Sequence, residues 1–141
     1  MKRLASITTA FIAVCLTVQP MAPANADIAK GEKNFKRCTA CHTLEKGKNR
    51  VGPSLYQVYG RKAGQAPKFK YSKGLQEAAA KGLVWNRENL MEYLKDPRKF
   101  LRDFTGNKRA RNKMLQKFKN EKFRQHVIDY LESLSKDPKK S

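Results

Sequence analysis

Residues 38–42 read Cys-Thr-Ala-Cys-His, and no other stretch of the chain restricts its possible folds as strongly. Two cysteines separated by two residues and followed directly by a histidine are the pattern of a c-type haem attachment site. The thiols of Cys38 and Cys41 can each add across a vinyl group of the porphyrin. His42 is then carried to the iron as an axial ligand. The motif therefore predicts a fold that wraps around one covalently attached haem c.

Two other chemistries use closely spaced cysteines. A thioredoxin-like redox pair lies in a βαβ unit, and no such pattern flanks residues 38–42. A structural zinc site needs two more Cys or His ligands, and only Cys15 and His126 remain in the chain. His126 is also a competing candidate for an iron ligand, but it falls beside core positions of an expected helix. The motif favours haem over both alternatives.

The first residues have the pattern of a secretory signal peptide. Lys2 and Arg3 form a positive start, residues 4–18 are apolar, and Ala-Asn-Ala at 24–26 is a cleavage pattern. The apolar stretch is too short for a membrane span, although an uncleaved N-terminal anchor remains an alternative. Cleavage after Ala26 removes Cys15 and leaves 115 of the 141 residues, 27–141, as one small domain in the periplasm.

The chain is strongly basic. Its formal charge is +19, and loss of Lys2 and Arg3 lowers this to +17. Residues 95–124 alone contain twelve Lys or Arg against three Asp or Glu. Such a surface attracts acidic partners and makes association sensitive to salt. Nucleic acid, anionic lipid and acidic protein all satisfy the charge, but nucleic acid is disfavoured because the chain lacks a reading motif and is expected to be exported.

Hydrophobic periodicity predicts a helical protein with long loops and no strands. A helix is expected from about Ile28 into the haem motif, and glycines and prolines break all pattern over 44–70. Asn86 and Asn120 are expected N-caps. The other expected elements are helices over 73–81, 87–94 and 120–134, a short helical turn at Pro97, and an irregular segment over 103–119.

Gly31 is unusual inside the first expected helix, because glycine there costs about 1 kcal/mol relative to alanine. Close approach by another helix would explain it. The final helix offers one apolar stripe, since its large residues recur at helical spacing: Phe123, Val127, Tyr130, Leu131 and Leu134.

Several further motifs make the chain resemble the class I cytochromes c, specifically the small soluble bacterial type close to mitochondrial cytochrome c. The resemblance covers nearly the whole mature chain. It rests on residues 42–47, 51–55, 60–67, Trp85, 90–94, 96–97, 112–114 and 127–131, in that order. The family fold is all-α, with three main helices, short helices and long loops around one haem. Gly31 and Phe35 resemble the point where its first helix crosses its last helix at Tyr130.

The resemblance also assigns residues around the haem. Pro53 is similar to the residue whose carbonyl accepts the second N–H of the proximal histidine. Tyr93 resembles the hydroxyl donor beside the distal sulfur. Donors to a buried haem propionate are implied at Arg61 and Trp85, with Tyr71 and Ser72 as further candidates.

Met114 resembles the sixth ligand of the iron, whereas Met91 lies in a helix motif as a packing residue. Met/His ligation raises the redox potential and closes both axial positions. The chain departs from the family by about eight extra residues over 102–111 and lacks a proline before the methionine. We hypothesise that this basic distal segment makes the Met114–iron bond more labile than is typical.

The resemblance implies a monomeric electron carrier and not an enzyme. It would accept electrons from a quinol-oxidising membrane complex and deliver them to a terminal oxidase or other reductase, by outer-sphere transfer at an exposed haem edge. The alternative is a peroxidase-like or ligand-sensing protein in which Met114 leaves the iron. The basic residues expected to dock on acidic patches of the partner complexes are Lys36, Arg37, Lys48, Arg98, Lys99 and Lys113.

Overall fold

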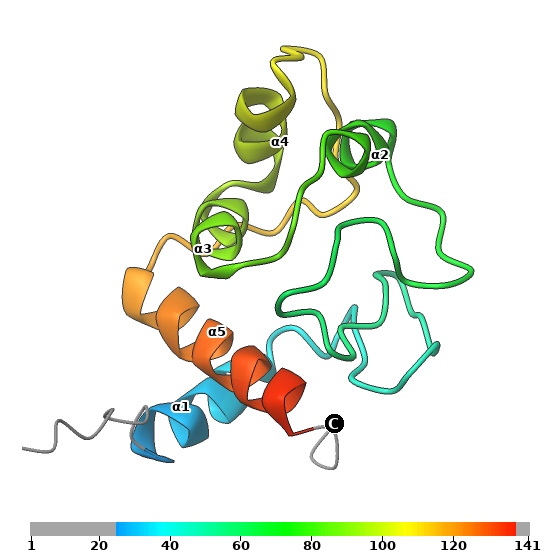
Figure 1. Ribbon diagram of the computed structural model, residues 1–141. Helices are drawn as coiled ribbons and strands as arrows, with labels where there is room; N and C mark the ends of the chain where they lie inside the picture. The colour runs from blue at the N-terminus through cyan, green and yellow to red at the C-terminus, as the bar shows by residue number, and fades with distance from the viewer. Residues whose placement is uncertain (1–24, 138–141) are drawn as a thin grey trace, which may run out of the picture.

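The computed structural model describes residues 25–137, which form five α-helices joined by long irregular segments (Figure 1). The helices are α1 (Asn25–Phe35), α2 (Lys73–Ala80), α3 (Arg87–Lys95), α4 (Pro97–Thr105) and α5 (Glu121–Lys136). Between residues 25 and 137 the β-structure is a single isolated bridge that joins Lys62 to Val84. The all-α prediction is confirmed.

Helices α1 and α5 cross at one end of the molecule (Figure 1). A Cβ atom at Gly31 would lie 2.1 Å from the carbonyl oxygen of His126 and 2.7 Å from Cβ of Tyr130. Only a glycine lets the two backbones come this close. Beside the crossing, the rings of Phe35 and Tyr130 pack with centroids 5.6 Å apart. The predicted close approach at Gly31 is therefore confirmed.

Asparagine caps start two of the helices, as the sequence predicts. Asn86 Oδ1 accepts a hydrogen bond from the Asn89 amide at 2.9 Å, at the start of α3. Asn120 Oδ1 accepts one from the Phe123 amide, also at 2.9 Å, at the start of α5. Each cap satisfies an amide that has no partner within its own helix.

The prediction of only a short helical turn at Pro97 is wrong. Helix α4 starts there and continues for nine residues to Thr105. Asp96 caps its start, and Gly106 ends it in a left-handed conformation with φ of 73°. The expected irregular segment therefore begins at Gly106 and not at residue 103. The reason is a buried face at helical spacing. Leu101 and Thr105 are buried, the Thr105 hydroxyl donates to the Leu101 carbonyl at 2.6 Å, and Phe100 stacks on Phe104 with centroids 5.7 Å apart.

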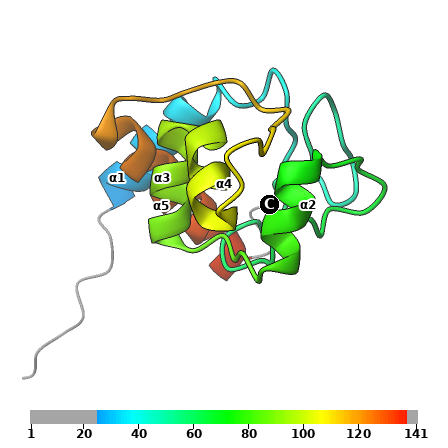
Figure 2. The same cartoon turned by 90° about the horizontal axis from the view of Figure 1, so that it is seen from above.

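Residues 44–70, all within the described range, contain no helix, as expected. Polar side chains hold this loop in place of regular structure. Ser54, 1% exposed, donates to the Glu45 carbonyl at 2.6 Å, and Asn49 donates to the Pro67 carbonyl at 2.8 Å. Seen from above, this loop lies on the same side as α2, away from α1 (Figure 2).

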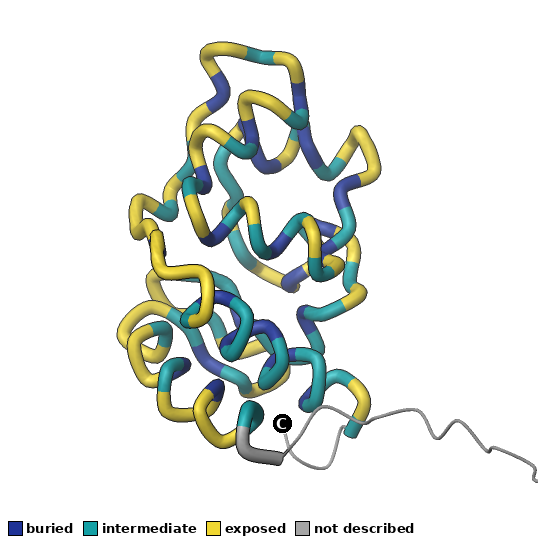
Figure 3. The backbone as a smooth tube through the Cα atoms, turned by 90° about the vertical axis from the view of Figure 1, so that its left-hand side faces the viewer, coloured by how far each residue is buried: buried dark blue, intermediate teal, exposed yellow. Residues whose placement is uncertain are grey.

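In Figure 3 buried and exposed positions alternate along the helices, so each helix turns one face inward.

Most of the predicted signal peptide, residues 1–24, lies outside the described residues. Helix α1 begins at Asn25, three residues before the expected start. Across residues 25–137, each helix is too short or too polar to cross a lipid bilayer.

Candidate haem-binding site

The Cys-x-x-Cys-His motif forms a helical turn directly after α1. The amide of Cys41 donates to the Cys38 carbonyl at 3.1 Å, and the amide of His42 donates to the same oxygen at 2.9 Å. Residues three and four apart lie on one face of such a turn. Both thiols and the imidazole therefore face the same region of the interior.

That region is a cavity of about 600 Å³, lined mostly by apolar side chains. Its size is typical of pockets that bind small organic ligands, roughly 300–1,000 Å³. All ten predicted site residues line it, whereas His126 does not. The ten are Cys38, Cys41, His42, Pro53, Arg61, Tyr71, Ser72, Trp85, Tyr93 and Met114. The structure thus brings together residues that are spread over more than half of the described chain.

His42 is oriented by a single hydrogen bond. Its Nδ1 lies 2.7 Å from the carbonyl oxygen of Pro53. A carbonyl oxygen only accepts, so Nδ1 carries the proton and Nε2 keeps a free lone pair for a metal. Burial lowers the pKa of His42, although the bond to Pro53 opposes this effect. The imidazole is therefore neutral and pre-oriented as a ligand.

Gly52 makes room for this imidazole, a role that the sequence analysis missed. A Cβ atom there would lie 2.3 Å from Cε1 of His42. The amide of Gly52 also donates to the Cys41 carbonyl at 2.8 Å, which ties the loop to the motif. The available signal was a glycine placed directly before Pro53.

Cys38 and Cys41 do not form a disulfide bond, so both sulfurs are available for covalent attachment of a haem. Burial raises the pKa of Cys38 to about 11, and the nearby positive charge of Arg37 offsets only part of this effect. Within residues 25–137, no group of three or more His, Cys, Asp or Glu side chains is placed to hold a metal ion.

The hydrogen bonds of the Arg61 guanidinium indicate whether the cavity suits an anionic cofactor. Its Nη1 donates to the Tyr56 carbonyl at 2.8 Å and its Nη2 to the Ser54 carbonyl at 3.1 Å. Its Nε is buried and has no hydrogen-bond partner in the structure. A buried guanidinium N–H without a partner is costly, and burial also lowers the pKa of Arg61. An anionic group in the cavity, such as a haem propionate, would satisfy both its charge and this N–H.

Two neighbouring hydroxyls keep a proton to donate. The Oη of Tyr71 accepts from the Ala66 amide at 3.0 Å, and the Oγ of Ser72 accepts from the Leu75 amide at 3.3 Å as the N-cap of α2. Neither contact uses the hydroxyl proton. Trp85, 7% exposed, lines the same cavity. These residues therefore fit a cofactor with an acidic edge.

Met114, far from the motif in sequence, lines the same cavity together with Tyr93 and Asn112. The Nδ2 of Asn112 donates to the Oη of Tyr93 at 2.8 Å and to the Met114 carbonyl at 3.3 Å. Burial raises the pKa of Tyr93 to about 12, with the Asn112 bond opposing it. Tyr93 is therefore a neutral phenol whose proton is free to be donated. The sequence analysis did not predict the Asn112 contact.

The comparison with known proteins matches this geometry to one family. The family model described as Cytochrome c matches residues 28–135. The chain belongs to the cytochrome c family. Cytochrome c2 of Rhodopseudomonas palustris is 46% identical to it over 114 residues, which cover 77% of this chain and 98% of that protein.

Solved structures agree with the sequence match. The structure of cytochrome c2 from Rhodospirillum centenum superposes with a TM-score of 0.73 at 42% identity, covering 77% of this chain and 98% of that one. That of cytochrome c2 from Rhodobacter sphaeroides gives 0.72 at 38% identity, covering 76% and 94%. Accordingly this cytochrome c binds one covalent haem c with its iron and is an electron carrier, not an enzyme.

The segment that carries Met114 in this cytochrome c is anchored at its far end by a buried cation. Arg124 is 4% exposed, and its Nη1 donates to the carbonyls of Phe118 and Lys119 at 2.8 and 2.7 Å. The amide of Phe118 donates to the Leu94 carbonyl at 2.9 Å. Sequence reasoning missed these anchors, because a basic residue in a basic chain is expected to face solvent.

The extra residues before Met114 pack against α2. Ala110 is 3% exposed, and a Cβ at Gly74 would lie 2.5 Å from the Arg111 carbonyl oxygen. Asn107 donates to Glu77 at 2.9 Å. These contacts hold the start of the distal segment, and the greater lability of the Met114–iron bond stays a prediction.

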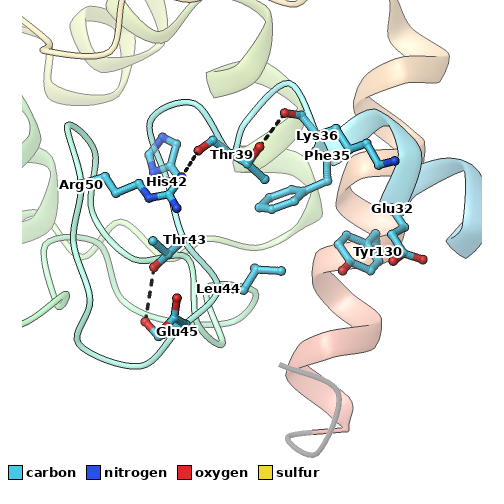
Figure 4. Close-up of a pocket in the computed structure, with 10 residues that line it drawn as sticks. All are labelled: Glu32, Phe35, Lys36, Thr39, His42, Thr43, Leu44, Glu45, Arg50 and Tyr130. Carbon is cyan, nitrogen blue, oxygen red and sulfur yellow. Dashed lines mark hydrogen bonds between the residues drawn. The ribbon is translucent and has the colours of Figure 1, made fainter.

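A second, more open hollow of about 360 Å³ shares Phe35 and His42 with the haem cavity (Figure 4). Arg50 reaches across it and donates to the Thr39 carbonyl, which fastens the loop to the haem motif. Its rim carries acidic and basic side chains side by side. In this cytochrome c the bond from Arg50 therefore ties the loop to the turn that carries His42.

Proposed function

We propose that this cytochrome c is a monomer exported to the periplasm, with its signal peptide cleaved after Ala26. There it carries single electrons from a quinol-oxidising membrane complex to a terminal oxidase or another reductase. The observation that supports this role best is the convergence of Cys38, Cys41, His42 and Met114 on one 600 Å³ cavity. The cytochromes c2 that it resembles are similar over nearly their whole length.

In this proposal the thiols of Cys38 and Cys41 would hold the haem covalently, and the imidazole of His42 and the sulfur of Met114 would bind its iron. Bound in this way, haem iron supplies a one-electron ferric–ferrous couple. The Pro53 carbonyl fixes the plane and the basicity of the imidazole through its hydrogen bond. With both His42 and Met114 bound, the iron would have no open site for oxygen or peroxide. This arrangement favours the carrier over the peroxidase or sensor alternative.

Other residues of the chain surround the cofactor and stabilise its charge. A buried propionate would accept hydrogen bonds from Arg61 and Trp85, with Tyr71 and Ser72 as further candidates. Tyr93 would donate toward the sulfur of Met114. The apolar lining excludes water, so little solvent must reorganise when the charge on the iron changes.

The rim of the cavity presents both charge and apolar surface to a partner. Arg37 and Lys113 line the cavity and are exposed. Val51 and Leu115, which also line it, are 80% and 68% exposed. Of the other predicted docking residues, Lys36 and Arg98 are exposed, while Lys48 pairs with Glu45 at 2.9 Å and Lys99 pairs with Asp103. We propose that this rim meets acidic patches on membrane redox complexes, in brief and salt-sensitive encounters.

Substitution of Met114 tests the assignment. The haem-loaded protein is expected to be low-spin and six-coordinate, to show a far-red sulfur-to-iron band, and to ignore carbon monoxide when reduced. Met114→Ala should abolish that band and open the iron to carbon monoxide. Met91→Ala is the matched control, because Met91 packs in α3 and does not line the cavity. Carbon monoxide binding by the unaltered protein would contradict the carrier and favour the sensor.

A further inference from the structure

The residue just before the haem motif contacts two aromatic rings. The guanidinium carbon of Arg37 lies 5.2 Å from the centroid of the Phe118 ring and 5.0 Å from that of Phe123. The two rings are themselves stacked, with centroids 4.7 Å apart and planes at 19°. Three segments therefore meet at this point: the start of the haem motif, the loop that follows Met114, and the first turn of α5.

Arg37 is ordered by these rings and not by an ion pair. Among the described residues no carboxylate lies within 4.0 Å of its guanidinium. A planar guanidinium can lie over both rings at once, whereas a lysine ammonium is a compact point charge. The contact is thus specific to arginine at this position.

Phe118 decides where the chain after Met114 is fixed. It is 5% exposed, and its amide donates to the Leu94 carbonyl at 2.9 Å. The three residues between Met114 and Phe118 are all exposed. Phe118 is therefore the first buried residue beyond Met114. Loosening of its ring is transmitted to the methionine through three exposed residues, of which Lys117 pairs with Asp96 at 2.6 Å.

We infer that Arg37 is a positioning residue that latches Phe118 against Phe123 and thereby holds Met114 over the cavity. The latch, which consists of Arg37, Phe118 and Phe123, links the covalent attachment of the haem to the segment that supplies its sixth ligand. The inference rests on the proposed ligand role of Met114.

The first test measures the latch itself, by hydrogen exchange of the Phe118 amide in the intact haem-containing protein. Arg37→Gln is expected to speed this exchange about 2- to 5-fold, the range that corresponds to a lost exposed cation–π contact. Arg37→Lys should give a smaller effect. Arg102→Gln is the matched control: it removes the same charged group from an exposed position on α4 that has no ring contact among the described residues. Unchanged exchange in Arg37→Gln would overturn the latch.

The second test measures the effect on Met114. Added imidazole competes with the methionine sulfur, so its apparent affinity reports how often the sulfur leaves the iron. Arg37→Gln should raise that affinity by a similar 2- to 5-fold factor, and Arg102→Gln should not. Faster exchange at Phe118 with no change in imidazole affinity would mean that the latch holds Phe118 alone, which overturns the positioning role.

A double-mutant cycle with Phe123→Leu separates the latch from general loosening. If Arg37 acts through the ring, Arg37→Gln should add almost nothing in the Phe123→Leu background. Independent, multiplying effects would overturn the inference. Absence of the far-red band in the unaltered protein would instead refute the ligation by Met114, and the proposed function would then fail even if the exchange of Phe118 still responded to Arg37.

Discussion

Replacement of Gly31 by alanine sets local helix propensity against tertiary packing. Propensity alone predicts that Gly31→Ala stabilises α1 by about 1 kcal/mol. The structure predicts the opposite sign. The new Cβ would lie 2.1 Å from the His126 carbonyl oxygen, whereas carbon and oxygen normally approach no closer than about 3.3 Å. The obstacle is backbone, so it cannot rotate away, and α1 must move off α5 by about 1 Å.

A gap of that size forfeits about a quarter to a half of the dispersion energy of the atoms that it separates. The crossing includes the Phe35–Tyr130 ring pair, so the loss extends beyond residue 31. Overpacking of a core costs about 1–3 kcal/mol, and a rigid neighbour places this case at the upper end. After the propensity gain of about 1 kcal/mol is subtracted, Gly31→Ala should destabilise the protein by about 2 kcal/mol.

Guanidinium unfolding of the haem-containing protein, followed by far-ultraviolet circular dichroism, measures this difference. With a slope of roughly 4 kcal/mol per molar, the midpoint should fall by about 0.5 M. Ala29→Gly is the control, since Ala29 is exposed on the same helix and should lose about 1 kcal/mol from propensity alone. If Gly31→Ala raises the midpoint or leaves it unchanged, the packing argument is wrong.

Three further substitutions test single contacts. Gly52→Ala should displace the imidazole of His42, since the new Cβ lies 2.3 Å from its Cε1; a smaller low-spin fraction in the optical spectrum is expected, and an unaltered spectrum would contradict it. Arg124→Met leaves two carbonyls without their donor and should cost about 2–3 kcal/mol in chemical unfolding; a loss within 0.5 kcal/mol, usual for a surface site, would show that the anchor is unimportant. The Lys117 ammonium, together with the Lys99 amide, lowers the pKa of the Asp96 carboxyl. Its charge therefore stabilises the fold above the unfolded pKa of about 3.9, and this stability is lost as the pH falls through the lower folded pKa. Asp96→Asn should flatten the loss of stability below about pH 4, and parallel curves for the two proteins would rule out this role.

Local patterns sufficed to predict the haem motif and most of the helices. Asn86 and Asn120 were recognisable as caps because an N-cap bonds an amide only three residues away. The stripe on α5 follows from helical geometry alone, and the structure extends that helix only to Lys136. Predictions of this kind succeed because every interacting partner lies within one or two turns of the same segment.

Helix α4 shows where local reasoning was misled. Its exposed basic residues, with Arg98, Lys99 and Arg102 among nine positions, conceal a narrow apolar face. The haem motif supplied three of the ten site residues and the resemblance to class I cytochromes c supplied the other seven, and all ten line one cavity. Composition and spacing alone did not assign roles to these seven, because all of them except Tyr93 lie outside the helices, in segments without periodicity.

The covalent motif, the helical class and the basic character follow from the sequence alone. The first two depend on neighbours along the chain, and the third depends on composition. The burial of Arg124, the bond from Asn112 to Tyr93 and the latch at Arg37 do not follow from the sequence alone. Each depends on which carbonyl, hydroxyl or ring a distant segment brings within a few ångströms. A guanidinium has the same formula on the surface and in the interior, and only the packing of the folded chain settles whether it meets water, a carbonyl or an aromatic face.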